Sequence, residues 1–518
     1  MEQLGVVFGL FVVLVVIATL ARRIQVPYPI LLVVGGLVIG LLPGLPTVEL
    51  DPELVLLIFL PPLLYAAAIA TPMRELRENL QPISLLAVGL VLATIAAVAA
   101  TAHLAIPGMS WQVGFTLGAI VSPPDPVAAT AIANRLGLPR RLVTILEAEG
   151  LFNDATALVA YRLAVAAVVT GSFSLARVGV GFVLAAVGAV VLGLVVGWAG
   201  RLILGRLFDP PVENTVQLLI PFAAYVPAEA LDFSGILAVL TAGLFLGRYG
   251  WGAITSAGRL QGQGLWDVLV FILEGLSFIL IGLQLRPALA GLSNDRPLVG
   301  LVGEAALVTA VVIVVRIIWV FAAAQPSRML GGRLAGRDPY PGWRRLGVLA
   351  WAGMRGVVSM AAALALPANF PQRDLLIFLT FVVIFVTLVG QGLTLPALIR
   401  RLEVVEPADR ITVEEAQTRA RIAQAALERL EELHHDLDVD DDRLEHLRHR
   451  YQHSIDHQQA RRGGDHDQRD QQLAHLRHEL LEAERAELLH LRDEPGISPA
   501  VFQRVLRDLD LEESRLDR

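Results

Sequence analysis

The chain has 518 residues and a formal net charge of −7, and 55% of its residues are hydrophobic whereas only 18% are charged. This composition, with a mean hydropathy of +0.60, excludes an ordinary soluble protein, because too few charged residues remain to cover its surface. The absence of cysteine excludes disulfides, thiolate metal sites and catalytic thiols.

Charge and histidine are unevenly divided along the chain. From Arg401 onward there are 29 acidic residues against 18 arginines, a balance of −11, so the first 400 residues carry +4. Ten of the 11 histidines also lie beyond residue 400. We therefore predict a membrane domain over residues 1–400 and an acidic, histidine-rich, helical cytoplasmic tail over 401–518. Nucleic-acid binding has no support, because the tail is acidic.

Long apolar runs fill the first 400 residues, and a run of about 20 such residues spans a bilayer as a helix. The sequence therefore predicts an all-α polytopic membrane protein with 13 transmembrane helices and its termini on opposite sides. We expect no cleavable signal peptide, because the first run lacks a basic leader and a small-residue cleavage site. The expected helices cover residues 4–21, 28–46, 53–71, 81–105, 112–134, 142–169, 178–205, 214–231, 234–248, 264–285, 298–323, 346–366 and 374–399.

The turns between these segments differ in their arginine content. Turns after even-numbered segments hold Arg177, Arg286, Arg296 and Arg373, whereas turns after odd-numbered segments hold many more. The richer set comprises Arg22, Arg23, Arg74, Arg77, Arg135, Arg140, Arg141, Arg201, Arg206, Arg248, Arg259, a cluster from Arg328 to Arg345, Arg400 and Arg401. Because basic loops stay cytoplasmic, we expect the N-terminus outside and the tail inside.

The fifth segment contains the stretch SPPDPVA, in which Pro123, Pro124 and Pro126 surround Asp125. Proline removes a backbone donor and clashes with the preceding turn, so a helix cannot continue through this stretch intact. Unwound backbone at membrane depth is tolerated where it lines a cavity, and the ends of half-helices act as partial charges. The pattern favours an ion site near Asp125, and a proline kink with Asp125 as a helix cap is compatible with it.

The sixth segment contains EGLFNDAT, with Glu149, Asn153 and Asp154 inside an apolar run. Successive helix residues point about 100° apart, so one of Asn153 and Asp154 can face an ion path while the other caps a broken helix. A carboxylate held away from water can be neutralised by either a proton or a hard cation, for which oxygen is the preferred ligand. The alternative is that these side chains make interhelical hydrogen bonds only.

Two buried arginines need acidic partners. Arg355 lies between Gly353 and Gly356 in the twelfth segment, and we expect Glu149 to be its partner. Glu274 and Arg316 are a second set of buried charges whose mutual contact the sequence leaves open, and structural pairing is favoured for them.

The tail predicts polar helices over residues 411–435, 440–461, 466–493 and 498–515. Four histidines recur at near-helical spacing: His446, His449, His453 and His457. Because histidine titrates near physiological pH, a pH sensor is one hypothesis. A solvated helical tail that contacts a regulator or the partner subunit is favoured over it, and a zinc site is a weaker alternative.

Four stretches together resemble the signature sequences of the monovalent cation/proton antiporters, in particular the bacterial NhaP-type and eukaryotic NHE-type sodium/proton exchangers. They are FLPPLLYAAA at 59–68, SPPDPVA at 122–128, EGLFNDAT at 149–156 and AGMRGVVSMA at 352–361, in the same order as in the family.

The resemblance implies two inverted six-helix repeats in which broken helices 5 and 12 cross near the ion site. It also implies a moving core, here about residues 81–169 and 298–399, and dimerisation helices, here about 4–71 and 178–285. It further implies a homodimer in the plasma membrane, surrounded by lipid.

The resemblance also implies roles for single residues. Asp154 is implied to bind the cation and the proton, with Asn153 as its partner residue. Asp125 is implied to be the charge at the helix crossing, and Glu149 the mate of Arg355.

This chain departs from the family pattern at three positions. Ala66 stands where the family often has an acidic residue, Gly150 where it often has serine, and Pro124 where it often has threonine. Each difference removes a possible oxygen ligand, which leaves the preference between sodium and potassium open.

The resulting hypothesis is a secondary transporter, with no enzyme activity and no cofactor, that exchanges Na⁺ for H⁺ one for one without net charge movement. Potassium/proton exchange is the alternative, and Li⁺ is a further candidate cargo. An intramembrane hydrolase is disfavoured because the spans hold no convincing Ser/His pair or metal cluster, and a passive channel because a proton-binding carboxylate fits exchange better.

Overall fold

The computed structural model describes residues 2–24, 26–42, 52–170, 175–250, 252–292, 298–324 and 342–405, together with 418, 421–428, 430, 445, 448–452, 480 and 484 in the tail. The chain divides into two compact units, Met1–Val405 and Glu406–Arg518. We refer to them as the membrane unit and the tail unit.

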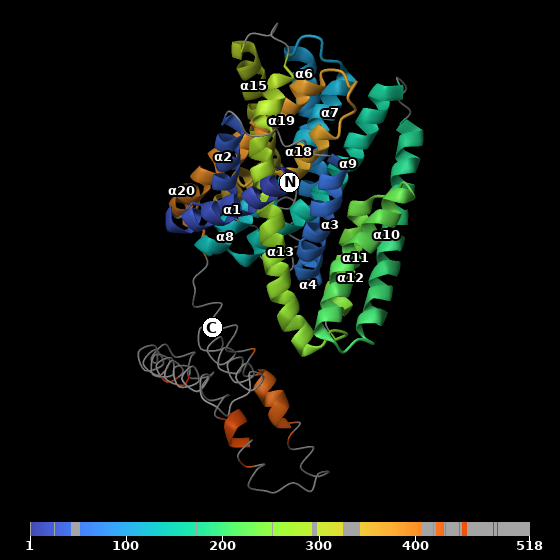
Figure 1. Ribbon diagram of the computed structural model, residues 1–518, viewed down its shortest axis with the longest axis vertical. Coiled ribbons are helices and arrows are strands. Elements are labelled where there is room, and N and C mark those ends of the chain that lie inside the picture. Colours follow the sequence, from blue (N-terminus) through green and yellow to red (C-terminus); the bar gives the residue numbers. More distant parts are fainter. Residues whose placement is uncertain are drawn as a thin grey trace. The chain divides into compact units, whose positions relative to one another are not determined.

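Helices account for all regular structure in the described residues of the membrane unit (Figure 1). The first half contains α1 (Glu2–Ile24), α2 (Tyr28–Leu41), α3 (Pro52–Ala70), α4 (Met73–Glu78), α5 (Leu80–Ser84), the π-helix η1 (Leu85–Leu90), α6 (Val91–Ala105), α7 (Trp111–Val121), α8 (Pro126–Leu136) and α9 (Arg140–Thr170). The second half contains α10 (Leu175–Leu204), α11 (Pro210–Ala230), α12 (Gly235–Tyr249), α13 (Ser256–Leu283), α14 (Leu285–Ala290), α15 (Leu298–Ala323), α17 (Trp343–Trp351), α18 (Val357–Leu364), α19 (Arg373–Phe385), the π-helix η2 (Val386–Gln391) and α20 (Gly392–Leu402).

Within the described residues, each apolar segment expected from the sequence overlaps one helix or consecutive helices, and residues 43–46 of the second segment lie outside them. Within the described ranges, six helical stretches are long and apolar enough to cross a membrane, and three shorter apolar helices accompany them. The six cover Leu80–Ala105, Arg140–Val169, Val183–Leu204, Ser256–Ala290, Val299–Ala323 and Arg373–Leu402. The number of thirteen spans and their inverted repeat remain predictions.

Three large groups of buried apolar side chains, and a small one around Leu76, Ile83 and Ala148, hold the described part of the membrane unit together. One joins α1, α2 and α13 to α8, α9, α17 and α20, and a second joins α6 and α7 to α15, α18 and α19. The third joins α3, α10, α11 and α12, which lie side by side (Figure 1).

The fifth and twelfth segments are both interrupted, the fifth as its prolines predict and the twelfth as the resemblance to the antiporters implies. Residues 122–125 separate α7 from α8, and residues 352–356 separate α17 from α18. Proline accounts for the first interruption, because Pro126 occupies the first turn of α8, where a missing N–H costs nothing. α8 then ends at Gly137, whose φ of 67° is accessible to glycine at little cost.

The tail unit is described only in short pieces, all of them helical. Ala423 and Leu427 are buried there, with Leu430 and Tyr451 packed against them. His449 is exposed. His446, His453 and His457 lie outside the described residues.

Candidate functional site

The two helix interruptions contact each other directly. The backbone N–H of Asp125, in the first interruption, donates to the carbonyl of Met354 in the second at 2.7 Å. The two unwound segments thus satisfy part of each other's backbone hydrogen bonding, which water does not supply in the hydrocarbon region of a membrane.

The side chain of Asp125 caps the N-termini of α8 and α18, the half-helices that follow the two interruptions. Its side chain accepts from the backbone N–H of Val127 at 2.9 Å and from that of Val357. A carboxylate at this position satisfies free N–H groups and complements two helix dipoles at once. Gly356 is required for this approach, because a Cβ there would overlap the carboxylate of Asp125.

The side chain of Arg355 binds the carboxyl end of α7 and the unwound backbone of the second interruption. Its Nε donates to the carbonyl of Val121 at 3.1 Å, and its Nη1 donates to the carbonyl of Gly353. Its backbone N–H donates to the hydroxyl of Thr387, in η2, at 3.1 Å. This guanidinium is fully buried, and it neutralises the partial negative charge at the carboxyl end of α7.

The expected pairing of Glu149 with Arg355 is wrong in this structure, because Arg316 of α15 is the partner. Arg316 donates to both carboxylate oxygens of Glu149, at 2.5 and 3.0 Å. The same guanidinium donates to the carbonyl of Leu349 at 3.1 Å, near the end of α17. Arg355 donates to backbone carbonyls instead. The negative charge of Glu149 is therefore compensated by Arg316.

Asn153 and Asp154 point to different surroundings, as their offset on α9 requires. The buried Asn153 donates from its amide to the carbonyl of Pro124 at 3.0 Å and so binds the unwound backbone between α7 and α8. Pro124, which replaces a common threonine of the family, therefore contributes its carbonyl to this contact. Asp154 faces a cavity instead.

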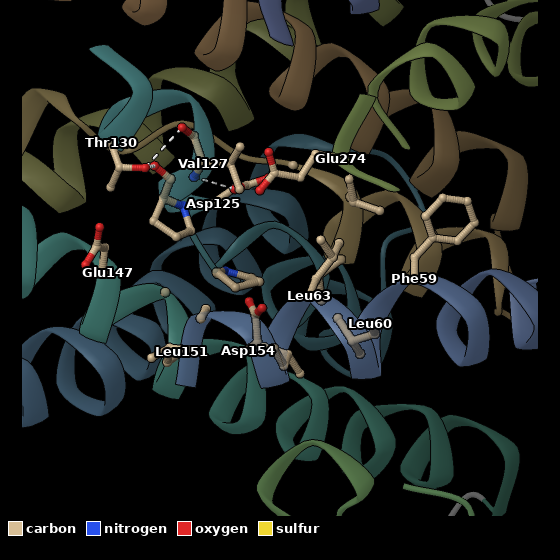
Figure 2. A pocket seen from close by; sticks show the side chains of 18 of the residues that line it. Phe59, Leu60, Leu63, Asp125, Val127, Thr130, Glu147, Leu151, Asp154 and Glu274 are labelled. Carbon is tan, nitrogen blue, oxygen red and sulfur yellow. Dashed lines mark hydrogen bonds between the residues drawn. The ribbon is translucent and has the colours of Figure 1, made fainter. Parts of the chain in front are cut away.

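The cavity has a volume of about 370 Å³ and receives side chains from the first interruption and from α2, α3, α8, α9, α13 and α18. Figure 2 shows the carboxylates of Asp154, Asp125 and Glu274 directed into it. Within the described part of the chain, no hydrogen bond or ion pair engages the Asp154 carboxylate. It therefore remains available to a ligand.

Glu274 does not meet Arg316, so these two residues are not partners. Glu274 accepts a hydrogen bond of 2.6 Å from the hydroxyl of Tyr28, a residue that no sequence motif marks. Glu147, the first glutamate of the sixth segment, lines the same cavity and was also not selected as a candidate.

Two of the positions that depart from the family pattern contact or adjoin the cavity. A Cβ on Gly150 would overlap the ring of Pro126, so a serine does not fit beside this proline. Ala66 lies on α3, whose Leu63 and Ala67 line the cavity.

Comparison with known proteins decides the family. Residues 10–401 match the family model described as sodium/hydrogen exchanger, transmembrane. The chain belongs to the sodium/hydrogen exchanger family.

Several relatives support this assignment. A protein of Mycobacterium tuberculosis named an uncharacterized Na(+)/H(+) exchanger is 37% identical over 534 residues, which cover 99% of this chain and 97% of the relative. The sodium, potassium, lithium and rubidium/H(+) antiporter of Bacillus subtilis is 34% identical over 389 residues, 72% of this chain and 58% of that protein.

The fold also matches a solved structure, that of the sodium proton antiporter MjNhaP1 from Methanocaldococcus jannaschii. The TM-score is 0.61 at 21% sequence identity, over 78% of this chain and 99% of that structure. The chain is therefore a multi-pass membrane transporter with the NhaP antiporter fold, and its family activity is cation/proton antiport.

Proposed function

We propose that this exchanger carries Na⁺ and H⁺ in opposite directions, one for one, and that both bind at Asp154. The observation that carries the proposal is the Asp154 carboxylate, which is directed into the cavity beside the helix interruptions without a hydrogen bond or ion pair to another described residue. The carboxylates of Glu149 and Asp125 are already engaged by Arg316 and by backbone N–H groups.

Competition at one carboxylate couples the two fluxes. An empty, charged carboxylate is costly to move through a low-dielectric interior, whereas one neutralised by a proton or a cation is not. Asn153 is neutral and carries no second proton, so each cycle exchanges one charge for one charge. Carboxylate oxygen, backbone carbonyls and water are the ligands that a hard cation such as Na⁺ prefers.

Alternating access would come from the core helices moving against the dimerisation helices, around a site near the bilayer midplane.

We place the transporter in the plasma membrane as a homodimer, with its N-terminus outside and its tail in the cytoplasm. The cavity extends to Asn134 and Glu147, near the arginine-rich end of α8 and α9, so it would open toward the cytoplasm. The tail would contact a regulator or the partner subunit.

Potassium/proton exchange is the second candidate. It is favoured by the Bacillus subtilis relative, which is named an antiporter of potassium, lithium and rubidium as well as sodium. The missing side-chain oxygens at Ala66 and Gly150 also leave fewer ligands to enforce one ion radius.

The experiment is cation-dependent dissipation of a pH gradient in proteoliposomes, followed by a pH-sensitive dye with sodium, potassium and lithium in turn. Asp154→Asn should abolish the signal for every cation, because the amide cannot exchange a proton for a cation. Asp209→Asn is the matched control, since Asp209 is exposed and makes no side-chain capping bond. Substantial exchange by Asp154→Asn would refute the assignment of the site.

The stoichiometry is tested by the same assay with the membrane potential clamped at different values. One-for-one exchange predicts an initial rate that does not change with the potential. A steep dependence on potential would contradict it.

A further inference from the structure

The cavity has a second acidic wall opposite Asp154. Glu274 of α13 and Tyr28 of α2 line it, and Figure 2 shows the Glu274 carboxylate directed toward the side where Asp125 lies. The proposed mechanism assigns no role to this wall.

The wall is built on two tightly packed helices. A Cβ on Gly36 of α2 would overlap the backbone carbonyl of Ile279, and one on Gly282 of α13 would overlap the carbonyl of Val33. Such close backbone approach fixes α2 against α13 and with them the hydrogen bond of 2.6 Å from Tyr28 to Glu274.

Glu274 is engaged on one oxygen only. Tyr28 donates to Oε2, whereas no hydrogen bond or ion pair to Oε1 occurs among the described residues. Arg316 and Arg355, the fully buried arginines, are occupied by Glu149 and by backbone carbonyls. The other titratable side chains that line the cavity are Asp125, Glu147 and Asp154, all acidic.

A carboxylate in these surroundings needs a positive partner, because an unpaired charge in a largely apolar cavity is costly. The described protein supplies none, and the cavity is large enough for a cation with part of its water shell. The missing partner is therefore a proton or a small cation drawn from the transported species.

We propose that Glu274 and Tyr28 form a second binding position for the transported cation or proton, on the wall opposite Asp154. The proposal rests on Na⁺/H⁺ exchange at Asp154. An arriving cation would exchange part of its water for Oε1 of Glu274 before it passes to Asp154. Because α2 and α13 belong to the helices proposed as the dimerisation scaffold, the occupant of Glu274 is not carried with the core, and the stoichiometry stays one for one.

The test compares Glu274→Gln, Glu274→Asp and Tyr28→Phe with Glu78→Gln, a control at an exposed position at the end of α4. Exchange is measured in proteoliposomes as a function of Na⁺ and pH, and thermal stability is measured on the same purified proteins. Loss of a charged ligand predicts that Glu274→Gln raises the apparent KM for Na⁺ about tenfold with its maximal rate nearly unchanged. Glu274→Asp, which keeps the charge, should recover part of this loss, and Tyr28→Phe should give a smaller increase.

Two results would overturn the proposal. The first is a KM for Na⁺ and a pH profile in Glu274→Gln that equal those of the control. The second is a lower maximal rate and lower thermal stability with unchanged KM, which would make Glu274 a purely structural residue. If Glu274→Gln does not fold, the KM of Glu274→Asp and Tyr28→Phe decides in its place.

Asp154→Asn in the same series separates the two proposals. If it is inactive while Glu274→Gln behaves as the control, only the second position is wrong. If Asp154→Asn still exchanges Na⁺ for protons, the proposed function itself fails.

Discussion

Arg316 and Arg355 are both fully buried, yet they compensate different groups. Arg316 forms a two-point ion pair with Glu149, whereas Arg355 donates to backbone carbonyls at half-helix ends. Removing one member of a buried pair leaves the other as an uncompensated charge, which costs about 3–5 kcal/mol.

Arg316→Met alone should therefore lower the free energy of unfolding by about 3–5 kcal/mol. Thermal unfolding of the purified protein in detergent measures this loss. The double variant Arg316→Met with Glu149→Leu should recover most of it, because both charges are then absent. A single variant as stable as the parent chain would show that the pair does not stabilise the fold.

Residue-level prediction from sequence succeeded where chain geometry decides and failed where packing decides. The offset of Asn153 and Asp154 along α9 was sufficient to predict that they face different surroundings. The partner of Glu149 was not predictable, because both arginines lie mid-span and sequence does not show which one packs against α9. The hydrogen bond from Tyr28 to Glu274 joins residues 246 positions apart and leaves no local signal.

At the scale of the element, the two interrupted helices form one electrostatic unit. Asp125 accepts from N–H groups at the start of α8 and α18, and Arg355 donates to a carbonyl at the end of α7. Prolines predicted the first interruption, and the resemblance to the antiporters implied the second, which lies over the Gly-Met-Arg-Gly stretch 353–356. The π-helices η1 and η2 were not predicted, because their spans are almost entirely apolar and a rotated helix face therefore leaves no signal in the sequence.

Gly356→Ala tests this unit, because the added Cβ would displace the Asp125 carboxylate from the N-terminus of α18. We expect a loss of about 1–3 kcal/mol in unfolding free energy from overpacking, together with slower Na⁺-dependent exchange. Gly303→Ala in α15 is the matched control, since a Cβ there meets no atom within 4 Å. Equal exchange rates in the two variants would argue against a required contact between Asp125 and α18.

At the scale of the whole molecule, the membrane unit contains every residue placed at the site, and it ends at Val405. We therefore predict that truncation after Val405 leaves cation-dependent exchange and its pH profile unchanged. The measurement is the exchange rate in proteoliposomes across pH, for the full chain and the truncated one. A profile shifted by the truncation would instead favour the pH-sensor hypothesis for His446, His449, His453 and His457.

Competition between a proton and Na⁺ at Asp154 is the central claim, and proton release on Na⁺ binding tests it most directly. Calorimetric titration of the purified full chain with NaCl, in buffers of different ionisation enthalpy, gives the number of protons released per cation bound. In a pH range where the site is protonated, the account predicts about one proton per Na⁺ for the parent chain, and neither Na⁺ binding nor release for Asp154→Asn. Na⁺ binding without proton release, or equal release by Asp154→Asn, would contradict it.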